Sequence, residues 1–270
     1  MFYHLLGERM FSKALLYVLI ATLLHIAFIN TGWFDRVTAE LGYEMYAERV
    51  DSVPFLPFPM PMNTLINFGY TLAGLAWLST FSKSNDFWGE SFCWYSIFYS
   101  LIQLARIVYQ TQRTAVLDQW ITTTIFCHVT LWITSLPSDG IVTRSFRSCN
   151  RGAILTVSFL SYFLSLYSDI GFDIALGIHM LIAVRAGYEA HQARGSAQSG
   201  AVFGKAVLCC LGFVVLKLAD LPLRDYWTPN CFSGHFLSKI CDVGQIYYAA
   251  ELVYVLNGNF ASFKQHFARD

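Results

Sequence analysis

The 270-residue chain has the composition of a membrane protein. Hydrophobic residues make up 55% of it and charged residues only 13%, whereas charged residues make up about 25% of a typical soluble domain. The mean hydropathy is +0.45. The formal net charge is +0 and the basic residues form no block or stripe, which excludes a nucleic-acid-binding surface. We therefore expect an integral membrane protein.

Hydrophobic runs separated by polar segments predict an all-α bundle with eight membrane-spanning helices. No small-residue cleavage site follows the first run, which indicates a retained signal anchor. The polar break at residues 168–171 is the weakest boundary, and fusion there would change the count by one. The predicted spans are residues 14–29, 63–81, 91–109, 119–136, 152–167, 170–188, 203–221 and 235–256.

Basic residues predict the orientation of these spans, because Lys and Arg accumulate in cytoplasmic loops. With both termini in the cytoplasm, the cytoplasmic segments carry Arg9, Lys13, Lys83, Arg144, Arg147, Arg151, Arg194, Lys205, Lys264 and Arg269. The chain then divides into an anchor helix with an acidic, proline-rich luminal loop (1–62), a seven-helix membrane core (63–256) and a cytoplasmic tail (257–270). No retention or peroxisomal signal closes the chain, and a Golgi or ER location is our hypothesis.

The last two predicted spans carry charged residues inside apolar runs. An ionised side chain at the centre of a membrane helix costs about 2.5 to 3.5 kcal/mol on insertion scales, so such residues usually face the protein interior. His235, Lys239 and Asp242 are spaced i, i+4 and i+7, which places all three on one helical face. This polar face is the centre of the candidate site.

Other polar residues fall near the same ends of their predicted helices and are expected to converge on this face. The candidate polar core site comprises Asn63, Asn67, Arg106, Asp118, Asp220, His235, Lys239 and Asp242. Two interpretations of these residues stay open. The charges could pair with one another and lock the helices in register, or they could bind the phosphate or carboxylate of a lipid head group.

Several short motifs carry a family resemblance. GYEMYAE at 42–48, AVLDQW at 115–120, LGFVVLKLAD at 211–220 and GHFLSKICDV at 234–243 resemble the transmembrane protein 187 family. More distantly, NTLIN at 63–67, LDQ at 117–119, LGFVVLKLAD and HFLSK are similar, in order, to motifs of the membrane hydrolase superfamily. That superfamily contains the alkaline ceramidases, the progestin and adipoQ receptors and the GPI-remodelling hydrolases, and the resemblance implies a seven-helix core behind the first helix.

In those hydrolases three histidines bind zinc and an aspartate handles the activated water. His235 matches one histidine, whereas Lys239 and Ile107 stand at the positions of the other two. The resemblance therefore implies the fold and argues against the chemistry, so no cofactor is predicted. We expect a non-catalytic relative that binds a membrane lipid or other amphiphile. The alternatives are a metal-dependent lipid amide or ester hydrolase with zinc at His235, and a transporter.

Overall fold

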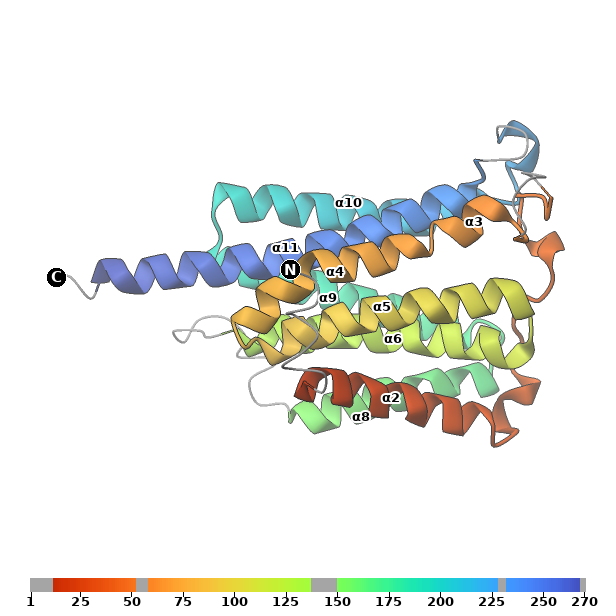
Figure 1. The fold of residues 1–270 in the computed structure, drawn as a ribbon, viewed down its shortest axis with the longest axis horizontal. Helices are drawn as coiled ribbons and strands as arrows, with labels where there is room; N and C mark the ends of the chain where they lie inside the picture. Colours follow the sequence, from red (N-terminus) through yellow and green to blue (C-terminus); the bar gives the residue numbers. More distant parts are fainter. Residues whose placement is uncertain (1–11, 52–57, 137–149, 228–231, 268–270) are drawn as a thin grey trace.

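The computed structural model describes residues 12–51, 58–136, 150–227 and 232–267, with the backbone alone for 259–267. Within these ranges the chain forms an elongated helical bundle without strands (Figure 1). Eight helices of 11 residues or more lie in the described ranges: α2 (Lys13–Ile29), α4 (Phe68–Lys83), α5 (Phe87–Tyr109), α6 (Gln112–Ser135), α8 (Arg151–Ser161), α9 (Gly171–Arg194), α10 (Ala197–Ala219) and α11 (Gly234–Phe267).

Polar side chains cap the first turn of several of these helices. Ser12, Asp86 and Thr111 each accept a hydrogen bond from a backbone N–H in the first turn of the helix that follows. Such caps satisfy donors that have no partner inside the helix. Between α5 and α6 the chain reverses at Gln110, whose φ of 46° lies in the left-handed region. α5 and α6 therefore run antiparallel with a short connection.

The helices form an inner group and an outer pair. α4, α5, α6, α9, α10 and α11 pack in succession around the interior, while α2 and α8 lie on the outer side of α5 and α6 (Figure 1). His25 and Phe28 of α2 pack against Trp120 of α6 and Phe159 of α8. The first helix is thus held by aromatic contacts on the outside of the bundle.

The helices fall on the eight predicted runs, although several extend beyond the predicted bounds: α6 begins at Gln112, α9 ends at Arg194 and α10 begins at Ala197. The run at 63–81 is split into α3 (Pro61–Leu65) and α4, and the run at 152–167 changes from α8 to a tighter 3-10 turn, η3 (Tyr162–Leu166). The break at 168–171 is real, since α9 begins at Gly171, where a Cβ atom would lie 2.3 Å from the backbone of Leu164. α11 continues to Phe267, beyond the predicted end at residue 256.

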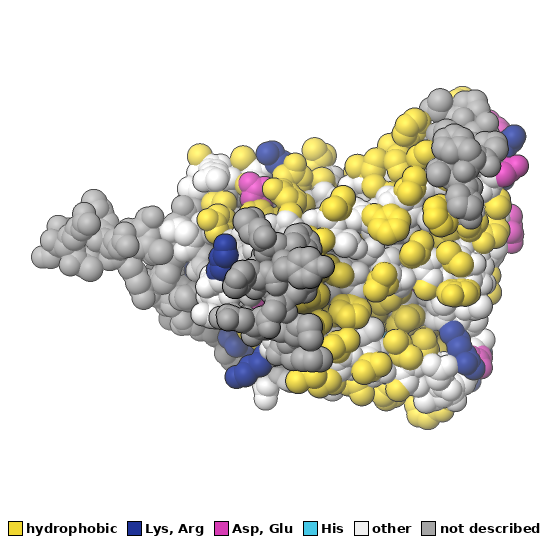
Figure 2. Space-filling model, in the orientation of Figure 1, with side chains coloured by type: hydrophobic (Ala, Val, Ile, Leu, Met, Phe, Trp, Pro, Cys, Tyr) yellow, Lys and Arg dark blue, Asp and Glu magenta, His cyan; other side chains and the backbone are white. Residues whose placement is uncertain are grey.

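Hydrophobic side chains cover much of the outside of the bundle. On the face shown in Figure 2 they occupy the middle, and charged side chains gather towards the two ends. α9 and α10 are both long and apolar enough to cross a membrane, while α2 and the segment Arg151–Leu166 are apolar but shorter. Of the basic residues used for the orientation, Arg9, Arg144, Arg147 and Arg269 lie outside the described residues.

Candidate functional site

Five of the eight predicted site residues line one cavity at the end of the bundle where α11 begins. We call this end the site end and the space, of about 70 Å³, the polar cavity. α5 contributes Arg106, α6 contributes Asp118, and α11 contributes His235, Lys239 and Asp242. The three α11 residues therefore share one face of the helix, as their spacing predicts. Other polar side chains that line the cavity are Glu40, Tyr46, Tyr70, Tyr99, Gln103, Gln119, Thr122 and Lys217.

The buried charges of α11 are held by neutral partners. Lys239, only 4% exposed, donates from Nζ to Oδ1 of Asn67 at 2.8 Å. Asp242 accepts from the Tyr70 hydroxyl at 2.7 Å. The helix break before α4 is what brings Asn67 to this point, because its amide lies at the junction of α3 and α4. Both charges thus keep part of their hydrogen-bonding capacity for the cavity.

The other pair of charges is arranged in the same way. Arg106 donates to Oε1 of Gln110 at 2.8 Å and to the backbone oxygen of Glu40, and Asp118 accepts from the side-chain amide of Gln103. Among the described residues, none of the site's cations lies within the 4.0 Å of a carboxylate that defines an ion pair. Each of these charges instead meets a neutral group and faces the cavity, which favours the second of the two interpretations, binding of a head group.

His235 lies at the rim of the polar cavity. Its ring packs edge-on against the ring of Tyr46, with centroids 4.7 Å apart. Burial raises the pKa of the Tyr46 phenol above its usual value, so this ring stays neutral. The contact joins the first turn of α11 to the loop that follows α2.

Asp220 lies outside the cavity and joins three segments of the chain. Its side chain, at the end of α10, accepts from the backbone N–H of His235 at 2.8 Å and of Ala47 at 2.9 Å. The residue is 3% exposed. A carboxylate in this position accepts hydrogen bonds from backbone N–H groups at the start of a helix. Its negative charge also interacts favourably with the positive end of the helix dipole. Asp220 therefore has a structural part in the site.

Asn63 likewise belongs to the support of the site, through a residue that the sequence did not single out. Both its backbone N–H and its side-chain amide donate to Oε2 of Glu48, at 2.9 and 2.6 Å, and Met62 N donates to Oε1 at 2.8 Å. Glu48 is only 3% exposed. Sequence reasoning placed it among the acids of the luminal loop. One signal in the sequence could have pointed to it. Pro61 marks the first turn of a helix, and an anion such as the Glu48 carboxylate stabilises the start of a helix.

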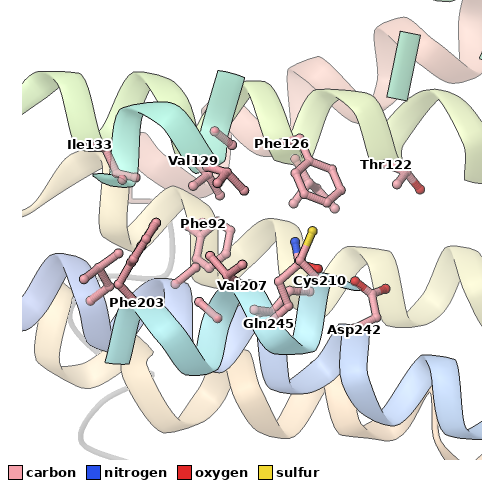
Figure 3. Close-up of a pocket in the computed structure, with 18 of the residues that line it drawn as sticks. Phe92, Thr122, Phe126, Val129, Ile133, Phe203, Val207, Cys210, Asp242 and Gln245 are labelled. Atoms are coloured by element: carbon pink, nitrogen blue, oxygen red, sulfur yellow. The ribbon is translucent and has the colours of Figure 1, made fainter. Parts of the chain in front are cut away.

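A second, apolar cavity of about 70 Å³ lies next to the polar one, deeper in the bundle. The two cavities share Tyr99, Thr122 and Asp242. Figure 3 shows Thr122 and Asp242 at one end of the apolar cavity and Ile133 and Phe203 at the other. Gln245 also lines it, and its buried Oε1 atom has no hydrogen-bond partner. The two cavities are therefore neighbours, one lined by charged groups and the other mostly by hydrocarbon.

The residues of the polar cavity do not fit a zinc ion. His235 is the single imidazole among its lining residues, and Arg106 and Lys239 place two cations beside it. In the part of the chain that the structure describes, no group of three or more His, Cys, Asp or Glu residues is arranged to hold a metal. Zinc sites need about three or four such ligands, so no chemical step through a metal follows from this site.

An all-helical chain with a hydrophobic exterior and charged residues around an internal cavity belongs to the class of helical membrane proteins. The chain is a member of the TMEM187 protein family, whose sequence pattern matches residues 14–254. Transmembrane protein 187 of Bos taurus is 36% identical over 248 residues, which cover 88% of this chain and 94% of the relative. Transmembrane protein 187 of Homo sapiens is 37% identical over 242 residues, covering 88% and 90%. No solved structure matches the chain.

Proposed function

We propose that this membrane protein binds an amphiphile, with an anionic head group in the polar cavity and a single hydrocarbon chain in the apolar cavity. The observation that carries this proposal is that the two cavities are neighbours and share Tyr99, Thr122 and Asp242 in their walls. A space that changes from charged to apolar within the bundle matches the two parts of such a ligand.

The charges favour an anionic head group over a cationic one. Arg106, Lys217 and Lys239 line the polar cavity with positive charge, against the carboxylates of Glu40, Asp118 and Asp242. The carboxylates of Asp118 and Asp242 each already accept a hydrogen bond from a neutral donor, Gln103 or Tyr70. Charge-assisted hydrogen bonds from Arg and Lys to phosphate or carboxylate are among the strongest that proteins make. A phosphate or carboxylate head group is therefore the expected class.

The length of the apolar cavity suits a single alkyl chain of moderate length. Its lining runs along α11 from Asp242 to Leu252, an axial distance of about 15 Å, which corresponds to about a dozen carbons in an extended chain. Its volume of about 70 Å³ is about half that of an engineered cavity that accepts benzene. Binding of the chain therefore requires the helices around the cavity to move apart.

The proposal includes eight membrane spans, with the site end on the luminal side of a Golgi or ER membrane and both termini in the cytoplasm. Support comes from the alternation of the helices and from basic residues at the opposite end of the bundle. Lys13, Lys83, Arg151 and Arg194 begin or end their helices there, as the distribution of Lys and Arg in membrane proteins favours. The order of the sequence motifs supports a distant, non-catalytic relation to the ceramidase-type hydrolases.

The proposal is tested by ligand binding to the protein purified in nanodiscs. Radiolabelled dodecyl phosphate and dodecanoate serve as probes, with dodecanol as the uncharged counterpart. Replacement of Lys239 by glutamine keeps a donor for Asn67 and removes the charge. Loss of a charged hydrogen bond worth about 1.5 to 3 kcal/mol should weaken binding of the anionic probes by about 10- to 100-fold.

Arg185→Gln is the matched control, because Arg185 is exposed on α9 and pairs with Glu189 at 2.8 Å, away from both cavities. This variant should bind all three probes as the wild type does. Equal affinity of the wild type and Lys239→Gln for dodecyl phosphate and dodecanoate, or no binding by the wild type, would contradict the proposal.

A further inference from the structure

α9 and α10 meet closely at only one end of their length. They are joined by the short connection at Gly195 and Ser196, and next to it His191 hydrogen-bonds Ser199 at 2.9 Å and stacks on Phe203. At Gly187 an added Cβ atom would lie 3.1 Å from Phe203. These contacts hold the two helices together at the end opposite the site.

Away from the connection, facing residues of α9 and α10 line the cavities. Val184 and Val207 face the apolar cavity, and Leu176 and Phe213 face the polar cavity near the site end. We call the boundary between residues 172–184 of α9 and 207–217 of α10 the α9–α10 seam. Both cavities therefore lie along a single seam between two helices.

The outer surface at this seam is hydrophobic. α10 is the least buried of the two long apolar helices, with 11% of its apolar window inside the bundle. Leu211, Val215 and Leu218 are exposed along it, and Leu181 is exposed on α9. In a membrane these side chains contact lipid, so the seam faces the hydrocarbon of the bilayer.

The site end of the polar cavity is covered by the loop that follows α2. Glu40 and Tyr46 from this loop line the cavity. Three contacts fix the loop in place: Arg106 donates to the backbone oxygen of Glu40, Arg224 donates to that of Tyr46 at 3.1 Å, and Asp220 accepts from Ala47. A ligand that came from the aqueous side would have to displace this loop.

Lys217 stands where the seam meets the polar cavity. It is exposed on α10, two residues before the helix ends, and it also lines the cavity. Among the described residues, its ammonium has neither a hydrogen-bond partner nor an ion pair. A lysine near the end of a membrane helix extends its charge to the level of the lipid head groups. Its position fits first contact with an anionic head group in the bilayer.

We propose that the amphiphile enters sideways from the bilayer, through the α9–α10 seam, and that Lys217 guides its head group into the polar cavity. This inference rests on the proposed function. It also accounts for the small size of the cavities, because α10 moves away from α9 about the fixed connection to admit the chain. Capture and release are then limited by the opening of the seam.

Crosslinking tests the route. In a background with the seven native cysteines replaced by alanine or serine, Leu176→Cys and Phe213→Cys are bridged by a thiol crosslinker that contains a cleavable disulfide. His191→Cys with Ser199→Cys, at the end already closed and outside both cavities, is the matched control pair. Uptake and release of radiolabelled dodecyl phosphate are followed in nanodiscs.

Bridging the seam should slow both uptake and release by about tenfold or more, and reduction of the crosslinker should restore them, while bridging the control pair changes neither. If the unbridged protein binds the probe and bridging the seam changes neither rate, the lateral route is wrong and the proposed function stands. If neither the wild type nor the unbridged protein binds, both proposals fail.

Lys217→Gln in the wild-type background tests the same inference without engineered cysteines. Because Lys217 is exposed, the variant should fold. Removal of one guiding charge should slow association of dodecyl phosphate by about 3- to 10-fold and leave association of dodecanol unchanged. An unchanged association rate for dodecyl phosphate would overturn the part assigned to Lys217.

Discussion

Replacement of Asp220 by alanine should destabilise the protein without removing any group from the cavity. The Asp220 carboxylate accepts the backbone N–H groups of His235 and Ala47, at 2.8 and 2.9 Å. Loss of an acceptor costs about 1 to 3 kcal/mol for each donor left unsatisfied, and both donors are partly shielded from water, so the lower half of this range applies. We expect a loss of about 2 to 4 kcal/mol, or a melting temperature lowered by about 4 to 16 °C.

The assay is thermal unfolding in mild detergent, followed by tryptophan fluorescence. Asp225→Ala is the control, because Asp225 lies five residues further on and is exposed. It should change the melting temperature by less than about 2 °C. Asp220→Asn keeps one acceptor oxygen, so its melting temperature should lie between those of Asp220→Ala and Asp225→Ala. A melting temperature for Asp220→Ala equal to that of the wild type would refute the capping role.

Three further substitutions test other parts of the structure by the same assay. Glu48→Ala removes the acceptor of three hydrogen bonds and should cost about 3 kcal/mol; no change would exclude the buried carboxylate as a helix cap. Gly171→Ala places a Cβ atom 2.3 Å from the Leu164 carbonyl oxygen, whereas Gly177→Ala on the same helix meets nothing within 4 Å. The first should lower the melting temperature and the second should leave it equal or slightly higher, so equal effects would contradict the close approach. Gln245→Leu removes a buried oxygen without a partner and should raise the free energy of unfolding by about 1 kcal/mol. A lower melting temperature would contradict this reasoning.

The sequence predicts the helices well because their apolar runs are long and the breaks between them are polar. The short junction at 168–171 was correctly predicted, since α9 begins at Gly171. Hydropathy does not reveal the split between α3 and α4, because Ile66 and Asn67 continue the same run. That split depends on tertiary partners: the Asn67 backbone oxygen accepts from Ser100, and its side chain accepts from Lys239.

The candidate site was predicted in part. Helical periodicity places Lys239 and Asp242 on one face, and both residues line the polar cavity. The sequence left open whether opposite charges pair, and it does not reveal that a neutral side chain such as Tyr70 would be their partner. Glu48 was missed because its partners depend on how a loop folds back over 15 residues, and no local pattern determines that path.

The unequal lengths of the helices have a consequence for the surrounding membrane. α2 has 17 residues and α9 has 24, which correspond to about 26 and 36 Å of helix, against a hydrocarbon core about 30 Å thick. The short helix lies on the outer side of α5 and α6, and the long one adjoins the seam. A short helix is accommodated by local thinning of the bilayer and a long one by tilting or local thickening, so the membrane around the bundle should be thinner beside α2 than beside α9.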